Sequence, residues 1–506
     1  MNKSKTKSFI AEIPIVVSRR EEKVILDGFE VSRRLYNSYL GECLSRLGKM
    51  RNSKDWSLAR KIKDKELKKE VFKKIHEEFN FKESSIHEFA KNCRNNGNFT
   101  NRIGSLENQV IATRAFRAVN EYKLNKRGKP RFKGRVKTLE SIENKSNYSG
   151  LRYNSDIKAV EYRGLTLFLK HKGLDKDLWL KHALSCRTKF CRLIHRNIKG
   201  KTRWFVQLIQ EGIPLAKYET KEGCEVGLDV GPSTIAIVSN TSQSLVKFAA
   251  SVEQPWKESR LIQRKMDRSR RANNEDCFNE NGTYKKGSKI KIRSNNYIKL
   301  QNEYREIERV LKVRRKREHG NLTNKILSQG NIIKTEKLSY KSFQKNFGRS
   351  TKVRAPGLFM NLLAYKAERA DGKLSELNTQ ILKLSQFDHI RNDYQKKKLS
   401  DRWHKLGYEE IFVQRDIYSA FLAMVSSEKT IQLTQAINTW AIVNPQLVST
   451  GWIRNKTASV DRLLETTNNL AKPVYSSERL SLMKTKAIDS RLSSSLAKNP
   501  SSSYSL

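Results

Sequence analysis

Acidic residues are scarce in this chain. It carries 52 Asp and Glu against 101 Lys and Arg, and its formal net charge at pH 7 is +49. A compact protein of this charge repels itself, and binding a polyanion relieves the repulsion and releases counterions. The composition therefore predicts a nucleic-acid partner and salt-dependent binding. A solvated basic surface, as in a ribosomal or nucleoid protein, fits the same charge, whereas an anionic membrane fits it less well.

Long apolar runs are absent too. No stretch approaches the roughly 18 apolar residues that a membrane-spanning helix needs, and residues 1–8 lack the hydrophobic core of a signal peptide. We therefore expect a soluble, unexported cytoplasmic protein with no membrane partner. Hydrophobic residues still make up 37% of the 506 residues, which is enough for the cores of about two to four domains.

Cysteine is also infrequent and does not form a recognisable metal motif. The six cysteines are scattered, and the close pair Cys186 and Cys191 has no second pair at the spacing of a zinc ribbon. This pattern predicts a reducing compartment and no bound zinc.

The first 222 residues predict a small β-barrel that is interrupted by helices. Residues 9–17 alternate with the period of a strand, whereas apolar residues between about 20 and 124 recur at helical spacing. Further strands are expected at residues 159–162, 165–169, 190–194 and 204–209. We predict a barrel split into residues 1–20 and 125–222, with a helical insertion at residues 21–124.

A dense basic segment follows the predicted helices, from Lys126 to Arg135, and glycines and a proline interrupt it. Glycines let a backbone approach a nucleic-acid strand closely, while Arg131, Lys133 and Arg135 would contact phosphates. Its aromatic residue, Phe132, is expected to anchor the loop in the core in preference to stacking on a base.

Residues 223–430 alternate strands and helices. We expect strands at residues 226–239, 245–249, 331–338 and 379–384, with a long basic helical stretch after the second and a helix at 356–371. This order fits an α/β, ribonuclease-H-like fold. The run Lys312–Arg317 extends the basic stretch, and Arg314 and Arg315 are its candidate phosphate contacts; a solvated helix face or a localisation signal also fits this run.

Three acidic residues stand at the edges of apolar runs: Asp229, Glu336 and Asp416. Asp229 lies in a predicted strand, where an ionised carboxylate is costly unless it is paired or bound to metal. Glu336 closes a strand, and Asp416 begins a helix, where capping alone would account for it. A pair of Mg²⁺ ions that hydrolyses a phosphodiester needs hard carboxylate oxygens, held by separate rigid elements. Together the three acids predict one magnesium site.

Segments around these acids, Val226–Ser239, Asn331–Leu338 and Gln414–Ala423, resemble the three RuvC motifs of transposon-encoded TnpB proteins and of compact type V CRISPR effectors. The resemblance spans most of residues 125–425 and includes Gly128–Lys133, Lys199–Gln207, Tyr365–Gly372 and Lys397–His404. It implies an RNA-guided, Mg²⁺-dependent DNA endonuclease, encoded by a prokaryotic insertion sequence and associated with the nucleoid. Asp229, Glu336 and Asp416 would be its catalytic metal ligands.

The same resemblance implies a division of labour. The split barrel would be the wedge domain, the helical insertion the recognition lobe, and residues 223–430 the RuvC-like nuclease domain. Residues 339–354 would be the lid over the DNA strand, with Lys341, Arg349 and Arg354 as contacts, although an ordinary basic loop also fits; Arg415 would contact a phosphate. A guide RNA and a target DNA with a short flanking motif are the implied partners, and a homodimer is left open.

One departure from the family lies between the second and third motifs, where a four-cysteine zinc ribbon is usual. Residues 385–411 contain no cysteine, and His389 and His404 are too few for a closed zinc site. The apolar residues near the expected thiolate positions suggest a small apolar contact instead: Phe387, Ile390, Leu406 and Tyr408.

The missing ribbon favours one alternative, a protein that binds RNA and DNA without cutting, as a regulator of transposition. Direct strand transfer by a ribonuclease-H-fold transposase fits less well, because no separate end-recognition domain is evident. A basic structural RNA protein does not account for three coincident carboxylates. Residues 431–506 are interpreted as a C-terminal extension that becomes serine-rich and disordered after about residue 489.

Overall fold

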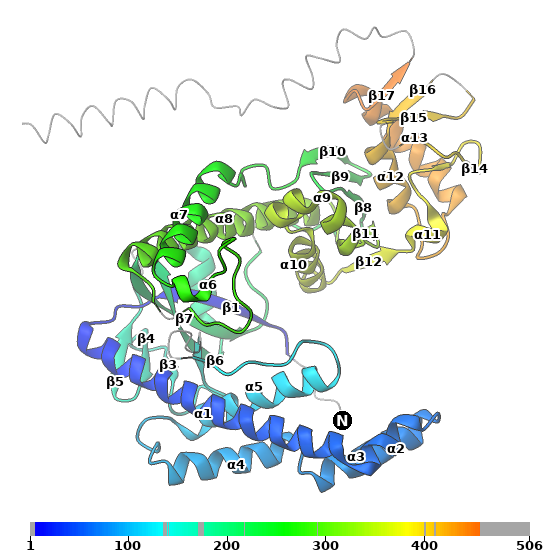
Figure 1. The fold of residues 1–506 in the computed structure, drawn as a ribbon. Coiled ribbons are helices and arrows are strands. Elements are labelled where there is room, and N and C mark those ends of the chain that lie inside the picture. Colours follow the sequence, from blue (N-terminus) through cyan, green and yellow to red (C-terminus); the bar gives the residue numbers. More distant parts are fainter. Residues whose placement is uncertain are drawn as a thin grey trace, which may run out of the picture. The chain divides into compact units, whose positions relative to one another are not determined.

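The computed structural model describes residues 6–134, 139, 141–170, 177–216, 218–290, 292–398, 401–408 and 411–455 (Figure 1). The chain is a mixed α/β protein that divides into two units. The first unit comprises Met1–Cys224, Lys247–Ile332 and Ser339–Leu374, and the second comprises Glu225–Val246, Ile333–Leu338 and Ser375–Leu506. No helix in the described ranges is both long and apolar enough to cross a membrane.

A helical subdomain occupies the region predicted to be helical. Its elements are α1 (Arg19–Asn52), α2 (Lys54–Lys61), α3 (Lys65–Glu78), α4 (Glu83–Asn96) and α5 (Ser105–Lys123). Helix α1 starts at a capping box, in which the Glu21 N–H donates to Ser18 Oγ and the Ser18 N–H donates to Glu21 Oε2. Its buried face, including Phe29, Leu35 and Tyr39, packs against α4 and α5. The helices expected between about residues 20 and 124 are present.

The strands of the first unit form two open antiparallel sheets. One has the order β1 (Ser8–Pro14), β7 (Lys201–Glu211), β6 (Thr188–Ile198) and β2 (Ser141–Glu143); the other has the order β3 (Arg152–Asn154), β4 (Ala159–Tyr162) and β5 (Leu165–Phe168). Helix α6 (Leu178–Ser185), which the sequence did not predict, precedes β6.

The expected closed barrel is wrong for the described residues. The two sheets are joined at one edge by a single bridge between Ile15 and Leu169. Beyond Pro14 the Ile15 N–H still donates to Trp204 O of β7 at 3.1 Å, and the Val16 N–H donates to Phe168 O of β5 at 2.9 Å. The other edge strands of the two sheets, β2 and β3, do not pair with each other in the described residues, so the sheets stay open.

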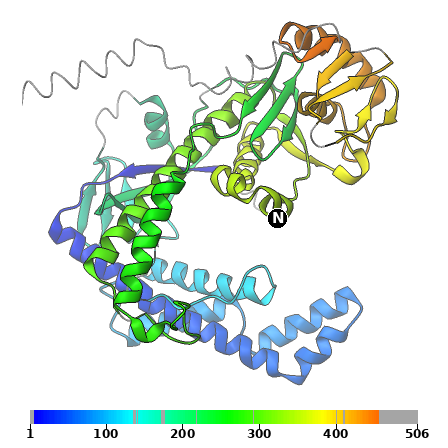
Figure 2. The same cartoon turned by 45° about the horizontal axis from the view of Figure 1, so that its top comes forward.

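The rest of the first unit is built from helices. Two long ones, α7 (Trp256–Ala272) and α8 (Asn295–Leu327), pack side by side (Figure 2). Helix α9 (Tyr340–Arg354), in the predicted lid, has a non-helical residue at Phe347 and is followed by α10 (Pro356–Arg369). The α7–α8 hairpin confirms the expected basic helical stretch.

The central sheet of the second unit has the order β10 (Ser242–Lys247), β9 (Thr234–Ser239), β8 (Glu225–Val230), β11 (Ile332–Glu336) and β12 (Lys373–Leu377). Residues 226–239 were predicted as one strand, but they form the antiparallel pair β8 and β9. The reason is a tight turn at Gly231-Pro232, where the Gly231 N–H donates to Thr234 O at 2.9 Å.

The strand predicted at residues 379–384 is also wrong. The chain instead ends β12 at Leu377 and begins a short helix, α11 (Thr379–Leu382). The side-chain oxygen of Asn378 accepts from the N–H groups of Gln380 and Ile381, which starts a helical turn in place of a strand.

The remaining elements of the second unit surround α12 (Arg415–Met424). They are β13 (Phe387–Asp388), β14 (Asp393–Tyr394), β15 (Trp403–Leu406), β16 (Ile411–Gln414), α13 (Leu433–Ser449) and β17 (Ile453–Asn455). Trp440, Val443 and Leu447 of α13 belong to the same hydrophobic core as α12, so the described start of the predicted extension is part of the unit. The predicted disorder after about 489 lies outside the described residues.

Candidate functional site

Two of the three predicted acids lie at the same end of the central sheet. Strands β8 and β11 begin at the same end of the sheet, as the hydrogen bond from the Ile332 N–H to Cys224 O at 3.1 Å shows. Near that end Lys334 Nζ lies 2.7 Å from Glu225 Oε1. Side chains alternate along a strand, so Asp229 shares the face of Glu225, and Glu336 shares the face of Lys334, each toward the opposite end.

Helix α12 covers this face and brings in the third acid. It lies so close to β8 that a Cβ on Gly227 would overlap Ala420 O and lie 2.6 Å from Met424 N. The C-terminal end of α12 is fixed near the end of the sheet at which β8 and β11 begin, because Lys334 Nζ donates to Met424 O at 2.8 Å. The first turn of α12, which contains Asp416, therefore lies toward the end of the sheet that carries Asp229 and Glu336.

The electrostatics of the site agree with this placement. Burial raises the pKa of Asp229 well above its usual range, and the nearby carboxylates of Asp416 and Glu336 raise it further, whereas Arg415 lowers it. Burial also raises the pKa of Glu336, although the Leu384 N–H opposes this shift by donating to the carboxylate. Three mutually repelling carboxylates in one partly buried place favour a bound cation.

Asp416 is surrounded by polar groups that hold it at the head of α12. Gln414 Oε1 accepts from the Ile417 N–H at 2.7 Å and caps the helix, and Gln414 Nε2 lies 3.4 Å from Asp416 Oδ2. Arg402 Nη1 and Arg415 Nε lie 3.9 and 3.8 Å from the same carboxylate. Arg415, the predicted phosphate contact, thus lies beside the acidic site, and its side chain is mostly buried.

The donor set of the site fits Mg²⁺, which prefers hard carboxylate oxygens. Within the described residues, however, no three His, Cys, Asp or Glu side chains converge closely enough to enclose one metal ion. The geometry gathers Asp229, Glu336 and Asp416 at one end of one sheet without closing them into a cage.

The described part of residues 385–411 differs in part from its prediction. Phe387 and Leu406 are buried in the core of the second unit, but Ile390 is 49% exposed and Tyr408 is 80% exposed. The apolar contact expected from all four is therefore wrong for Ile390 and Tyr408. The buried residues between them are polar instead: Asp388, His389 and His404. The sequence alone suggests zinc ligation as the only role for the two histidines.

The basic segment after the helical subdomain is fixed by its backbone. Lys133 O accepts from Arg33 Nη1 and Asn37 Nδ2, each at 2.9 Å, and the Lys133 N–H donates to Asn37 Oδ1. The predicted core anchor, Phe132, is wrong: its side chain is 59% exposed and rests beside Gly41 of α1. Three hydrogen bonds already hold the loop, so the aromatic ring is not needed for that purpose.

The other predicted phosphate contacts fall into two groups. Arg131, Arg314, Lys341 and Arg349 are exposed. Arg315 Nε donates to Val353 O at 2.6 Å, and Arg354 Nε donates to Phe248 O at 2.9 Å, so both guanidinium groups are partly engaged within the first unit. Arg135 lies outside the described residues.

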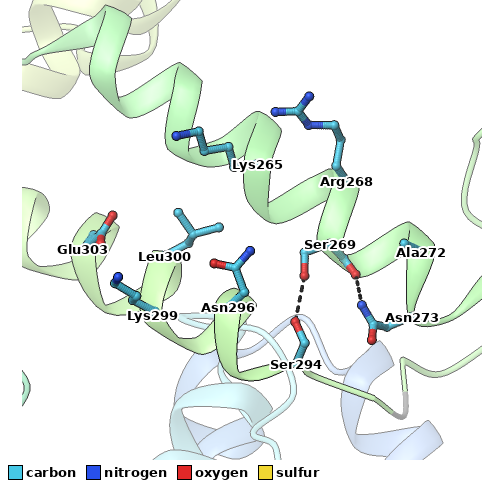
Figure 3. A pocket seen from close by; sticks show the side chains of 10 residues that line it. All are labelled: Lys265, Arg268, Ser269, Ala272, Asn273, Ser294, Asn296, Lys299, Leu300 and Glu303. Atoms are coloured by element: carbon cyan, nitrogen blue, oxygen red, sulfur yellow. Dashed lines mark hydrogen bonds between the residues drawn. The ribbon is translucent and has the colours of Figure 1, made fainter.

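A basic pocket that sequence analysis did not single out lies between α7 and α8 (Figure 3). This hairpin pocket has a volume of ≈ 760 Å³ and is lined by Lys265, Arg268, Ser269, Ala272, Asn273, Ser294, Asn296, Lys299, Leu300 and Glu303. The Ser269 and Ser294 hydroxyls hydrogen-bond at 2.8 Å and join the two helices. Basic residues at helical spacing along residues 256–271 were the signal that could have located it.

No family model and no curated protein matches the sequence. Two structures solved by cryo-EM are similar to the chain. A Cas12f1–sgRNA–target DNA complex matches with 12% identity and a TM-score of 0.42, over 83% of this chain and 98% of that one. A CRISPR-Cas12f ternary complex matches with 13% identity and a TM-score of 0.24, over 83% of this chain and 100% of that one. Identities and TM-scores are both low, so we rest no conclusion on these similarities.

Proposed function

We propose that this protein is an RNA-guided, Mg²⁺-dependent DNA endonuclease of the TnpB and compact type V kind. The observation that carries the proposal is the meeting of Asp229, Glu336 and Asp416 at one end of the central sheet, where burial and repulsion raise the pKa of Asp229. The sequence resemblance of the three segments that contain these acids supports the same reading, as does the net charge of +49.

In this proposal each part of the acidic site has a separate task. Asp229, Glu336 and Asp416 would hold Mg²⁺, which supplies a Lewis acid and an activated water for phosphodiester hydrolysis. Arg402 and Arg415, which lie beside Asp416, would bind the scissile phosphate. The two sheets of the first unit would form the wedge, α1–α5 the recognition lobe and α9 the lid.

The hairpin pocket is a candidate surface for the guide RNA. We expect a triple variant, Lys265→Ala, Arg268→Ala and Lys299→Ala, to weaken RNA binding and to reduce the slope of log K against log salt by about 2 to 3, because each lost phosphate contact removes roughly 0.7 to 0.9. Filter binding at several salt concentrations measures this slope.

A matched control removes the same charge from exposed lysines outside the proposed recognition lobe, wedge sheets and lid, through Lys181→Ala, Lys373→Ala and Lys429→Ala. This control should keep most of the salt slope. An unchanged slope in the pocket variant would exclude the hairpin pocket from the RNA surface.

The nuclease proposal is tested with the protein purified together with RNA transcribed from the flank of its gene. The complex is incubated with Mg²⁺ and a plasmid library that carries a fixed target beside randomised flanks. We expect double-strand cleavage of plasmids that share a short flanking motif. RNA-dependent DNA binding without cleavage would refute the nuclease.

That second outcome corresponds to the other candidate function, an RNA-guided DNA-binding protein that does not cut. The lack of cysteine in residues 385–411 favours it. A complex without RNA would argue against both candidates.

A further inference from the structure

A buried polar cluster lies where the sequence lacks the expected thiolates. It consists of Asp388, His389, His404 and Tyr418, whose exposed fractions are 0, 2, 0 and 1%. The four residues come from β13, the residue after it, β15 and α12, all within the second unit. We call this cluster the clasp. Polar side chains are rarely buried this completely unless they are bonded to one another.

Tyr418 makes two hydrogen bonds through one hydroxyl. Its Oη lies 3.0 Å from the backbone N–H of His389, which donates to it, and 2.6 Å from His389 Nδ1. Burial raises the pKa of Tyr418 well above its usual range and lowers the pKa of His389 to about 4. The hydroxyl oxygen accepts from the backbone N–H, and the histidine tautomer sets the direction of its second hydrogen bond, with Nδ1 of the neutral imidazole.

Asp388 ties the two sides of this region together. Its Oδ2 accepts from the Gly407 N–H at 2.9 Å, and its Oδ1 accepts from the Ile390 N–H at 2.9 Å. The carboxylate thus links the turn after β13 to the end of β15. Arg391 Nε, which donates to Gly407 O at 2.6 Å, lies 3.9 Å from the same carboxylate and partly balances its charge.

His404 connects this link to α12. Its ring stacks on Tyr418 with a centroid separation of 4.7 Å and an interplanar angle of 29°. Its Nε2 accepts from Lys397 Nζ at 3.3 Å and lies 4.0 Å from Asp388 Oδ2. Tyr418 is therefore held on one side by the hydrogen bonds of His389 and on the other by the ring of His404.

The position of Tyr418 gives the clasp its functional meaning. Tyr418 lies two residues after Asp416 in the first turns of α12, and a helix rises only about 1.5 Å per residue. Whatever fixes the phenol also fixes the backbone that carries Asp416. Packing of the ring alone would hold α12 against its neighbours, but the paired hydrogen bonds to His389 also define where the helix sits along its axis.

We propose that the clasp positions Asp416 in the acidic site without a metal of its own, and that Tyr418 is the positioning residue through which it acts. This inference rests on the proposed nuclease function. In this role hydrogen bonds and ring stacking connect His389 and His404 directly to the helix that carries the third acid.

The test is Tyr418→Phe, which keeps the ring and removes the hydroxyl. The probe is Mn²⁺, whose binding to the purified protein–RNA complex without DNA is followed by electron paramagnetic resonance. We expect Mn²⁺ to bind about 10-fold more weakly, the usual effect of losing an outer-shell partner. The Mg²⁺ concentration for half-maximal cleavage should rise by a similar factor, while RNA and target-DNA affinities stay unchanged.

Two further variants make the result decisive. Tyr394→Phe, a half-exposed tyrosine of β14, is the control and should bind Mn²⁺ as the parent does. His389→Leu removes the Nδ1 bond and leaves the backbone bond, so it should weaken Mn²⁺ binding in the same direction as Tyr418→Phe. The double variant should be no weaker than Tyr418→Phe, because the lost hydroxyl takes part in both bonds. His389→Leu also replaces Tyr418→Phe as the test should the latter fail to fold.

Each outcome separates the clasp from the proposed function. Unchanged Mn²⁺ binding in folded Tyr418→Phe overturns the clasp, even where the parent cleaves DNA. A parent that never cleaves, but whose Mn²⁺ affinity falls in Tyr418→Phe, overturns the nuclease and leaves the clasp as the positioning device of a metal-binding site. Loss of thermal stability with unchanged Mn²⁺ affinity would reduce Tyr418 to a packing residue and also overturn the clasp.

Discussion

Asp229→Asn should reduce DNA cleavage by about 10³-fold or more and at the same time make the protein more stable than the parent. Cleavage falls because an amide is a poor replacement for a carboxylate at a Mg²⁺ site. Stability rises by about 1 kcal/mol, because the substitution removes a charge that burial and two neighbouring acids disfavour. Binding of RNA and target DNA should be unaffected.

The stability gained by Asp229→Asn should depend on pH. In the unfolded chain an aspartate ionises near pH 3.9, whereas in the folded protein the pKa of Asp229 is raised. As the pH rises above about 4, ionisation therefore favours the unfolded chain, and this carboxyl costs the parent stability. The Asn variant lacks that cost, so its advantage should grow from acidic pH toward neutral pH in denaturant unfolding.

Mg²⁺ supplies an internal check on the same variant. The ion should raise the unfolding temperature of the parent, since it binds only the folded site, and should raise that of Asp229→Asn much less. Asp393→Asn, an exposed acid of β14, is the control and should change neither cleavage nor the Mg²⁺ effect. Full cleavage by Asp229→Asn would exclude this acid as a ligand, and a loss of stability would contradict the repulsive environment.

Gly227→Ala should destabilise the second unit by about 3 kcal/mol or more and abolish cleavage with it. A Cβ at this position would overlap the carbonyl of Ala420 and approach the Met424 nitrogen to 2.6 Å. Both are backbone atoms of α12, so no side chain can rotate away and the helix must leave the sheet. Asp416 would then move away from Asp229 and Glu336. Denaturant unfolding and the cleavage assay measure the two effects.

Gly231→Ala is the matched control in the turn after the same strand. There a Cβ would lie 3.1 Å from Thr234 O, which a shift of a few tenths of an ångström relieves. We expect a cost of about 1 kcal/mol or less. Equal destabilisation by the two substitutions would show that the close approach of α12 to β8 is not what Gly227 permits.

Much of the fold was predictable because its signals are local. The helical spacing of residues 20–124 and the alternation of residues 9–17 belong to single elements, and the structure confirms both. The errors occurred where one residue changes the outcome. The turn at Gly231 divides a continuous apolar run into β8 and β9, and the cap at Asn378 turns an apparent strand into α11.

The three acids of the site could be predicted from the sequence, but their arrangement in space could not. Each acid stands at the edge of an apolar run, which the sequence shows directly. Their meeting depends on long-range contacts such as the Lys334–Glu225 pair and the approach of α12 to Gly227, and no local pattern encodes these. The clasp was missed for a related reason, because His389, His404 and Tyr418 acquire partners only across three elements.

Helix α12 is held at both ends, and this has a consequence for how quickly the acidic site can rearrange. Gln414 caps its first turn, the Tyr418 hydroxyl is bonded nearby, and Lys334 Nζ is bonded to the carbonyl of Met424 at its end. A helix fixed in this way does not fray or slide on its own, so its amide hydrogens should exchange only when the whole unit opens. Any closure of the three acids around ions must then come from rotation of their side chains, which takes picoseconds to nanoseconds, and not from helix motion, which takes microseconds or longer.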